Sequence, residues 1–219
     1  MKKLIFYLVV FFSFIAIGYK SFFYFDGAAE KVQMEQNNTT LRLTKAEYKR
    51  IKEGDFILRR GFGFFSDIIS KRLNKGTIDV THAGIIVIRG GHLHVIHSLS
   101  SDVSPIDGMQ IQALNDFLRH SAPGTIIVTR AKGANADLGS TIAKLAEGYL
   151  SKKIPFDHHG LIDNDEELFC TELIWKILEK DLNHVVLPAT KEDRKNFFYS
   201  MDPMYDSKFF DIKINQYKK

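Results

Sequence analysis

One cysteine and a group of histidines are the side chains of this sequence best suited to nucleophilic chemistry. Cys170 is the only cysteine in the 219 residues, and His82 and His97 lie on either side of a Gly90-Gly91 pair. A thiol becomes a strong nucleophile when a histidine takes its proton and a third group orients that histidine. A lone cysteine is otherwise a small buried hydrophobic residue. The elements that position Cys170 therefore decide between the two interpretations.

The two histidines are predicted to lie on adjacent strands of a hairpin. Residues 82–88 and 92–97 are short apolar runs joined by the two glycines, which is a hairpin pattern. Strand alternation places His97 on the core-facing side, while His92 and His94 point to the other side. A three-histidine metal site from this strand is therefore not expected.

Cys170 is predicted to lie near the start of a helix. Leu173, Ile174 and Ile177 follow it at i+3, i+4 and i+7, so the thiol shares their inward face. A helix N-terminus and a positive histidine would lower the pKa of the thiol. Acidic residues in the preceding segment would raise it. These residues are Asp163, Asp165, Glu166 and Glu167.

Four segments together resemble the permuted papain-like hydrolases of the YiiX/YaeF-like group. These enzymes are relatives of the NlpC-type cell-wall peptidases and, more distantly, of the lecithin:retinol acyltransferase-like enzymes. The segments are Gly54-Asp55-Phe56-Ile57, His82-Ala83-Gly84-Ile85, Ile154-Pro155-Phe156-Asp157 and Phe169-Cys170-Thr171-Glu172-Leu173. The resemblance covers roughly residues 53–188. It implies an α+β, circularly permuted papain-like fold, with a small antiparallel sheet and the catalytic cysteine at a helix N-terminus.

The resemblance also implies roles for individual residues. Cys170 would be the nucleophile, His82 the general base and His97 the group that orients His82. The YiiX-like group usually has Glu at this third position, whereas the acyltransferase-like members have His. The substrate pocket would include Phe156, Asp157, Phe169 and Glu172. The alternative is that Asp157 caps a turn and that Glu172 pairs with Lys176 at i+4 on the surface.

The function that follows is an exported thiol hydrolase that cleaves an amide bond, in a peptidoglycan peptide or an N-acyl compound, through a cysteine thioester. Three alternatives remain open: a lipid ester or N-acyl phospholipid acyl hydrolase or acyltransferase, a catalytically silent envelope-binding module on the same fold, and a metal-binding protein. The histidine spacing matches no metal-ligand motif. No glycine-rich phosphate loop or dinucleotide fingerprint indicates an organic cofactor, and the basic residues are too scattered for a nucleic-acid surface.

The first residues have the composition of an export signal. Two lysines precede an apolar run, so residues 1–25 are predicted to be a signal peptide or an N-terminal membrane anchor. The lysines would stay in the cytoplasm, which sends the rest to the bacterial periplasm or envelope. Residues 4–25 would provide the membrane association. A polar linker at 26–43, the hydrolase domain at 44–200 and a C-terminal extension at 201–219 would follow.

Periodicity predicts further elements around the hairpin and the cysteine helix. Strands are expected at 56–58, 125–129 and, last in the chain, 185–188. Helices are expected at 44–51, which begins with a capping box of Thr44 and Glu47, and at 66–73, 111–118 and 137–150. The aromatic residues after Lys191 would either cap the domain or line part of a pocket, and the cap is the favoured interpretation.

Overall fold

The protein is built on one six-stranded antiparallel sheet. The computed structural model describes residues 2–162 and 164–218. The strand order is β4-β3-β2-β1-β5-β6. The strands are β1 (Phe56–Arg59), β2 (His82–Arg89), β3 (His92–Leu99), β4 (Gly108–Ala113), β5 (Ile127–Ala131) and β6 (Phe210–Asn215). The predicted α+β, permuted papain-like fold is confirmed, as is the β2–β3 hairpin.

Apolar clusters cover both faces of the sheet. Phe56 and Leu58 of β1 point into the larger cluster, whereas Ile57 between them points into the smaller one. All three side chains are fully buried. Alternate residues of a strand face opposite sides, so β1 is apolar throughout because it is central and covered on both faces.

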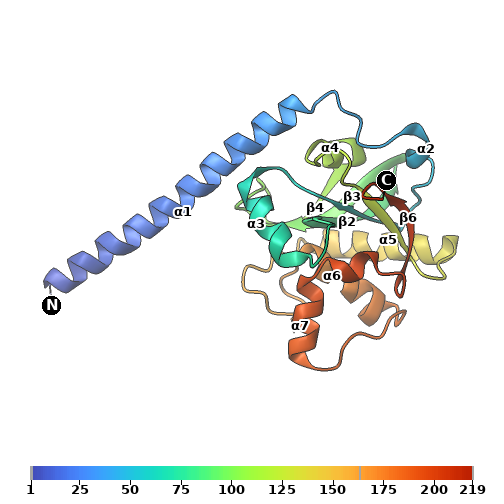
Figure 1. Cartoon of the computed structure of the whole chain (residues 1–219). Helices are drawn as coiled ribbons and strands as arrows, with labels where there is room; N and C mark the ends of the chain where they lie inside the picture. Colours follow the sequence, from blue (N-terminus) through green and yellow to red (C-terminus); the bar gives the residue numbers. More distant parts are fainter. Residues whose placement is uncertain (1, 163, 219) are drawn as a thin grey trace.

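Helices cover the two faces unequally (Figure 1). The larger cluster is covered by α5 (Ala136–Ser151), α6 (Cys170–Lys176) with its π-helical continuation η1 (Ile177–Asp181), and α7 (Lys191–Tyr199). The smaller cluster is covered mainly by α4 (Leu114–Arg119). Asn135 caps α5 by accepting a hydrogen bond from Leu138 N (2.9 Å). The remaining helices are α1 (Lys2–Gln36), α2 (Lys45–Tyr48), α3 (Gly63–Leu73) and the 3-10 helix η2 (Asp202–Tyr205).

The expected helix at 111–118 is partly wrong. Residues through Ala113 form the edge strand β4, and the helix begins at Leu114. The six residues of β4 pair with β3 from Leu99↔Gly108 to His94↔Ala113. This pairing across the sheet outweighs the local helical pattern.

The chain after the cysteine helix also differs from expectation. Residues 185–188 are not a strand; the N–H groups of His184 and Val185 bond back to Leu178 O and end η1. The last strand is β6, which pairs with β5. Phe210 of β6 is buried against Trp175 and Phe56. The segment predicted as a C-terminal extension therefore completes the sheet and its core.

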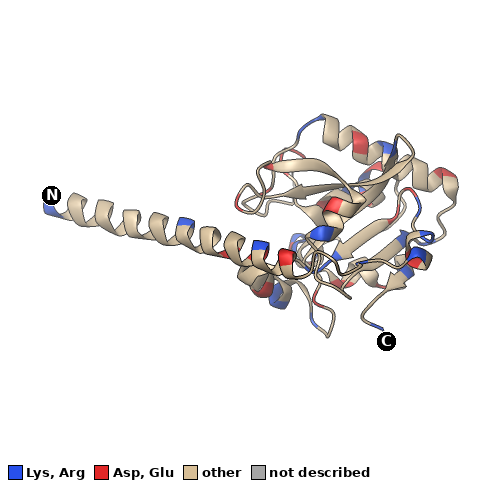
Figure 2. Ribbon diagram, turned by 90° about the horizontal axis from the view of Figure 1, so that it is seen from above, with Lys and Arg blue, Asp and Glu red and all other residues tan. Residues whose placement is uncertain are grey.

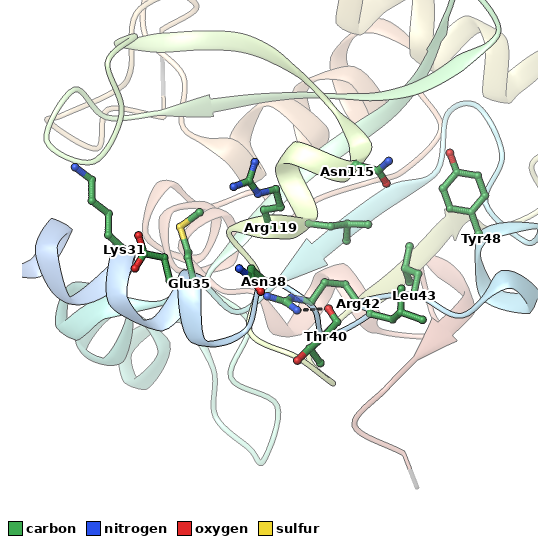
Figure 3. Close-up of a pocket in the computed structure, with 12 residues that line it drawn as sticks. Lys31, Glu35, Asn38, Thr40, Arg42, Leu43, Tyr48, Asn115 and Arg119 are labelled. Carbon is green, nitrogen blue, oxygen red and sulfur yellow. Dashed lines mark hydrogen bonds between the residues drawn. The ribbon is translucent and has the colours of Figure 1, made fainter.

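The expected polar linker at 26–43 is helical over much of its length. Helix α1 runs without a break from Lys2 to Gln36, and its N-terminal half projects away from the domain (Figure 1). The turn after it is held by the buried Arg42, which donates to Asn37 O (2.8 Å) and to Ser121 O (2.5 Å). Figure 3 shows Arg42 bonded to Thr40, beside a pocket of about 370 Å³ between α1 and α4.

Candidate active site

His82 and His97 form a buried pair at one end of the hairpin. His82 Nε2 lies 3.0 Å from His97 Nδ1, and both side chains are almost fully buried. Both rings contact Phe117 of α4. Gly84 makes room for the pair, because a Cβ there would lie 2.3 Å from Val95 Cγ1 and 3.3 Å from His97 Cβ. The hydrogen bond occupies Nε2 of His82, which leaves Nδ1 as the nitrogen available for other chemistry.

Both imidazoles are held neutral. Burial, followed by the positive charge of Arg59, keeps the pKa of His82 well below its ordinary value. The same two causes lower the pKa of His97 to about 3, against an opposing effect of the Gln112 side chain. A neutral pair shares one proton across the contact, and the tautomer with that proton on His82 Nε2 leaves Nδ1 with a free lone pair. His82 is then set up to accept a proton.

Arg59 is a buried cation beside this pair that the sequence analysis missed. It is the register partner of His82 across β1 and β2. Its guanidinium lies 5.0 Å from the Phe117 ring centroid and donates to His120 O (2.5 Å). Burial lowers its pKa to about 10, so it stays charged at neutral pH. Its position at the end of β1, next to Arg60, carries no sequence pattern that distinguishes it from an ordinary surface arginine.

Cys170 is the first residue of α6. The helix packs against β2 and β3. Two buried hydrogen bonds fix its start: Ser98 Oγ donates to Leu168 O (2.6 Å), and Thr171 Oγ1 donates to Phe198 O (2.5 Å). The first N–H groups of a helix have no partner within it, so the Cys170 N–H is available as a donor.

The environment of the thiol differs from the expected ion pair. Burial raises the pKa of Cys170, while the N–H of Ala83 and the charge of Arg59 act in the opposite direction. The resting side chain is therefore a neutral thiol. Of the preceding acidic residues, Asp165 pairs with Lys176 (2.9 Å) and also with Lys180. Asp163 lies outside the described residues.

A pocket of about 640 Å³ joins the thiol to the base. Cys170 and His82 both line it. Its walls come from α1, α3, the loop after β3, the loop after α5 and the end of α7, and they are largely apolar. The aromatic lining residues are Tyr19, Phe65, Phe156, Phe169 and Tyr199. The pocket of Figure 3 shares no lining residue with it.

The expected pocket residues fall into two groups. Phe156, Asp157 and Phe169 line the pocket, whereas Glu172 does not. Asp157 also caps a turn, because its Oδ1 accepts from His159 N (2.8 Å) and Gly160 N (2.6 Å). Its Oδ2 is buried without a hydrogen-bond partner among the described residues.

Glu172 supports the helix that carries Cys170. Its carboxylate accepts from Phe169 N (3.3 Å) and lies 3.3 Å from Lys176 Nζ. The pair with Lys176 was considered as a surface contact, but both side chains are buried. Burial raises the pKa of Glu172 to about 7. Glu172 therefore helps to position the start of α6, and with it Cys170, without lining the pocket itself.

The donor groups present at the site determine the chemistry that it can carry. Across residues 2–162 and 164–218, no group of three or more His, Cys, Asp or Glu side chains is placed to hold a metal ion. The reactive groups that meet in the pocket are a thiol and an imidazole with an oriented tautomer. Together they can form and hydrolyse an acyl-thioester.

Comparison with known proteins points to one family. The sequence model of the permuted papain-like amidase enzymes, YaeF/YiiX, C92 family, matches residues 50–202. Among solved structures, that of metalloprotein yiiX from Escherichia coli O157:H7 is similar, with a TM-score of 0.50 and 21% sequence identity. The similarity covers 61% of this chain and 68% of that chain. No curated protein sequence matches.

Proposed function

Because this chain belongs to the permuted papain-like amidase family of YaeF and YiiX, we propose that it cleaves an amide bond through a thioester on Cys170. The family supports a hydrolase of the cysteine type. The observation that carries the finer proposal is the His82–His97 contact of 3.0 Å, which orients the imidazole that shares a pocket with the thiol.

The reaction begins with the neutral pair. As the carbonyl carbon is attacked, His82 Nδ1 takes the proton of the thiol, and the sulfur forms a bond to that carbon. The developing oxyanion accepts a hydrogen bond from the Cys170 N–H at the start of α6. The Arg59 charge favours the thiolate. Burial disfavours separated charges, so this proton transfer occurs with substrate bound rather than in the empty site.

The later steps of the reaction return the proton from His82. The amine leaves as it takes the proton from His82 Nδ1, which yields the thioester and a neutral imidazole. Water then attacks the thioester while His82 accepts its proton, and the thiolate leaves as a thiol when that proton is returned. His97 stays neutral throughout and accepts from His82 Nε2, so it stabilises the imidazolium that forms twice per cycle.

The proposed location is the cell envelope. Helix α1 is long and apolar enough to cross a membrane, and the most apolar part of it is unburied. A signal sequence and a membrane anchor share these properties. The Lys2-Lys3 pair before the apolar run supports an orientation with the hydrolase domain outside the cytoplasm.

The test is to trap the acyl-enzyme on the full-length protein in detergent. The protein is mixed with a 4-nitrophenyl acyl ester and quenched, and its intact mass is measured. We expect one acyl group on Cys170, released by hydroxylamine, and none on Cys170→Ala. Release of 4-nitroaniline from the matching N-acyl anilide then tests amide cleavage. An adduct on Cys170→Ala equal to that on the wild type would refute the thioester.

A further inference from the structure

Helix α1 is part of the wall of the Cys170 pocket. Tyr19, near the middle of α1, lines the pocket together with Phe65 of α3. Its hydroxyl donates to Asp102 Oδ2 (2.5 Å), and Asp102 belongs to the loop after β3 that also lines the pocket. The helix that leaves the domain therefore does so at the mouth of the active site.

The C-terminal half of α1 is fixed to the domain by contacts over several turns. Phe23 packs on Phe65 with ring centroids 5.1 Å apart, and the buried Asp26 accepts from Phe65 N (3.0 Å). Glu30 pairs with His120 (3.0 Å), and Gln33 Oε1 accepts from Gly63 N (3.0 Å). A helix held at this many points sets the orientation of the domain, unlike a flexible tether.

The N-terminal half of α1 is apolar and exposed. Figure 2 shows several turns without a charged residue after the terminal lysines, and Figure 1 shows that no other element packs on them. Residues 4–19 span about 24 Å as a helix, slightly less than the roughly 30 Å of a bilayer core. Exposed aromatic residues then follow at the level of the pocket, as is typical of a membrane–water boundary. These are Tyr19, Phe22, Tyr24 and Phe25.

The elements around the pocket present further apolar side chains to solvent. Phe64 and Ile68, one turn apart on α3, are 55% and 43% exposed. Val103 and Ile106, on the loop after β3, are 38% and 55% exposed. A span shorter than the bilayer core draws the adjoining surface toward the lipid. These four residues, which we call the rim, are placed to enter the interface.

We infer that the rim docks on the bilayer that holds α1, and that the pocket takes an amphiphilic substrate whose acyl chain lies in that bilayer. This inference rests on the proposed function for its chemistry. The scissile carbonyl of such a substrate lies at the depth of the headgroups, where the aromatic residues of α1 place Cys170. The largely apolar walls of the pocket suit the first part of an acyl chain.

Docking is tested separately from catalysis by lipid quenching. In a Cys170→Ser background, which has no other cysteine, single cysteines are introduced as Phe64→Cys, Ile106→Cys and Ile88→Cys and labelled with bimane. Ile88 is the matched control: it is 47% exposed but lies six residues along β2 from His82, roughly 20 Å away. The full-length proteins are reconstituted in phosphatidylcholine vesicles with and without brominated acyl chains.

We expect brominated lipid to quench the label at 64 and 106 and to leave the label at 88 unchanged. Equal fluorescence loss at all three positions, or none at 64 and 106, would overturn docking. Because Cys170 is absent from these proteins, this result does not depend on whether the proposed hydrolase activity exists.

The substrate class is tested with a dodecanoyl anilide in vesicles and an acetyl anilide in solution. We expect Phe64→Ser with Ile68→Ser to lower the ratio of long-chain to short-chain rates, and Ile88→Ser to leave it as in the wild type. An unchanged ratio in the rim variant would overturn the amphiphilic substrate. Loss of both activities in Cys170→Ala supports the proposed function. If the wild type hydrolyses neither substrate, both the proposed function and the amphiphilic substrate class are contradicted.

Discussion

The two ends of the β2–β3 hairpin carry the same residue type in opposite settings. At one end, His82 and His97 are buried and lie within 3.0 Å of each other. At the other end, His92 is exposed and His94 is half-buried, and His94 Nδ1 lies 3.1 Å from the neighbouring His92 O. An imidazole becomes a directed base when burial and a partner fix its charge and tautomer. Only the first pair meets both conditions.

The difference also concerns the neighbours of each end. The buried end lies beside Arg59, Phe117 and the start of the Cys170 helix. The open end is a glycine turn, where Gly90 and Gly91 both have positive φ (57° and 78°). A turn of this kind exposes its flanking side chains to water. The predictions below test whether this contrast controls activity and stability.

The largest effect is expected from removing the base at the buried end. His82→Ala should lower kcat/KM by about 10³- to 10⁴-fold, since it removes proton transfer in both halves of the reaction. His94→Ala, on the same hairpin, should stay within about twofold of the wild type, because His94 lies at the open end of the hairpin, away from the reactive groups. Steady-state hydrolysis of the N-acyl anilide measures both. Equal losses of kcat/KM in the two variants would show that the buried end and the open end of the hairpin do not differ in their importance for activity.

A smaller loss of activity is expected from removing His97, the group that orients the base. His97→Ala should reduce kcat by about 10²-fold and leave His82 Nε2 buried without a partner, at a further stability cost of about 1–3 kcal/mol. His97→Asn offers a carbonyl oxygen to the same nitrogen and should recover part of kcat. A kcat for His97→Asn no higher than that for His97→Ala would show that His97 acts in another way.

The hairpin was predictable because its information is local. The two glycines and the flanking apolar runs determine the register, and alternation places His97 on the inner face. The start of α6 was recognisable from the i+3 and i+4 positions after Cys170. These features depend on short segments whose periodicity matches the final structure.

The features that were missed depend on contacts between distant segments. Residues 111–113 were predicted to begin a helix but belong to a strand that pairs with β3, and Phe210 joins the core from beyond the expected domain boundary. Arg59 affects the histidines only because β1 lies beside β2. The sequence placed Cys170 on the inward face of its helix, but it also predicted a positive histidine that would lower the pKa of the thiol, whereas in the structure burial raises that pKa.

The contrast between the two ends of the hairpin also predicts how stability depends on pH. The folded-state pKa values of His82 and His97 lie below the unfolded value of about 6.5, so below that pH the unfolded chain binds more protons. Their contribution to the free energy of unfolding is complete above pH 6.5 and is lost as the pH falls. For His97, whose pKa falls to about 3, the loss between pH 6.5 and 5 is about 1.5–2 kcal/mol, and His82 adds a loss in the same direction.

Urea unfolding of the full-length protein in detergent at these two pH values measures the loss. His97→Asn removes one titrating group and should show about half of the decrease attributable to the pair. His94→Ala, at the open end of the hairpin, is the matched control. If His94→Ala reduced the pH dependence of the unfolding free energy as much as His97→Asn does, resistance to protonation would not be confined to the buried end. The catalytic contrast drawn between the two histidine pairs would then lose its electrostatic basis.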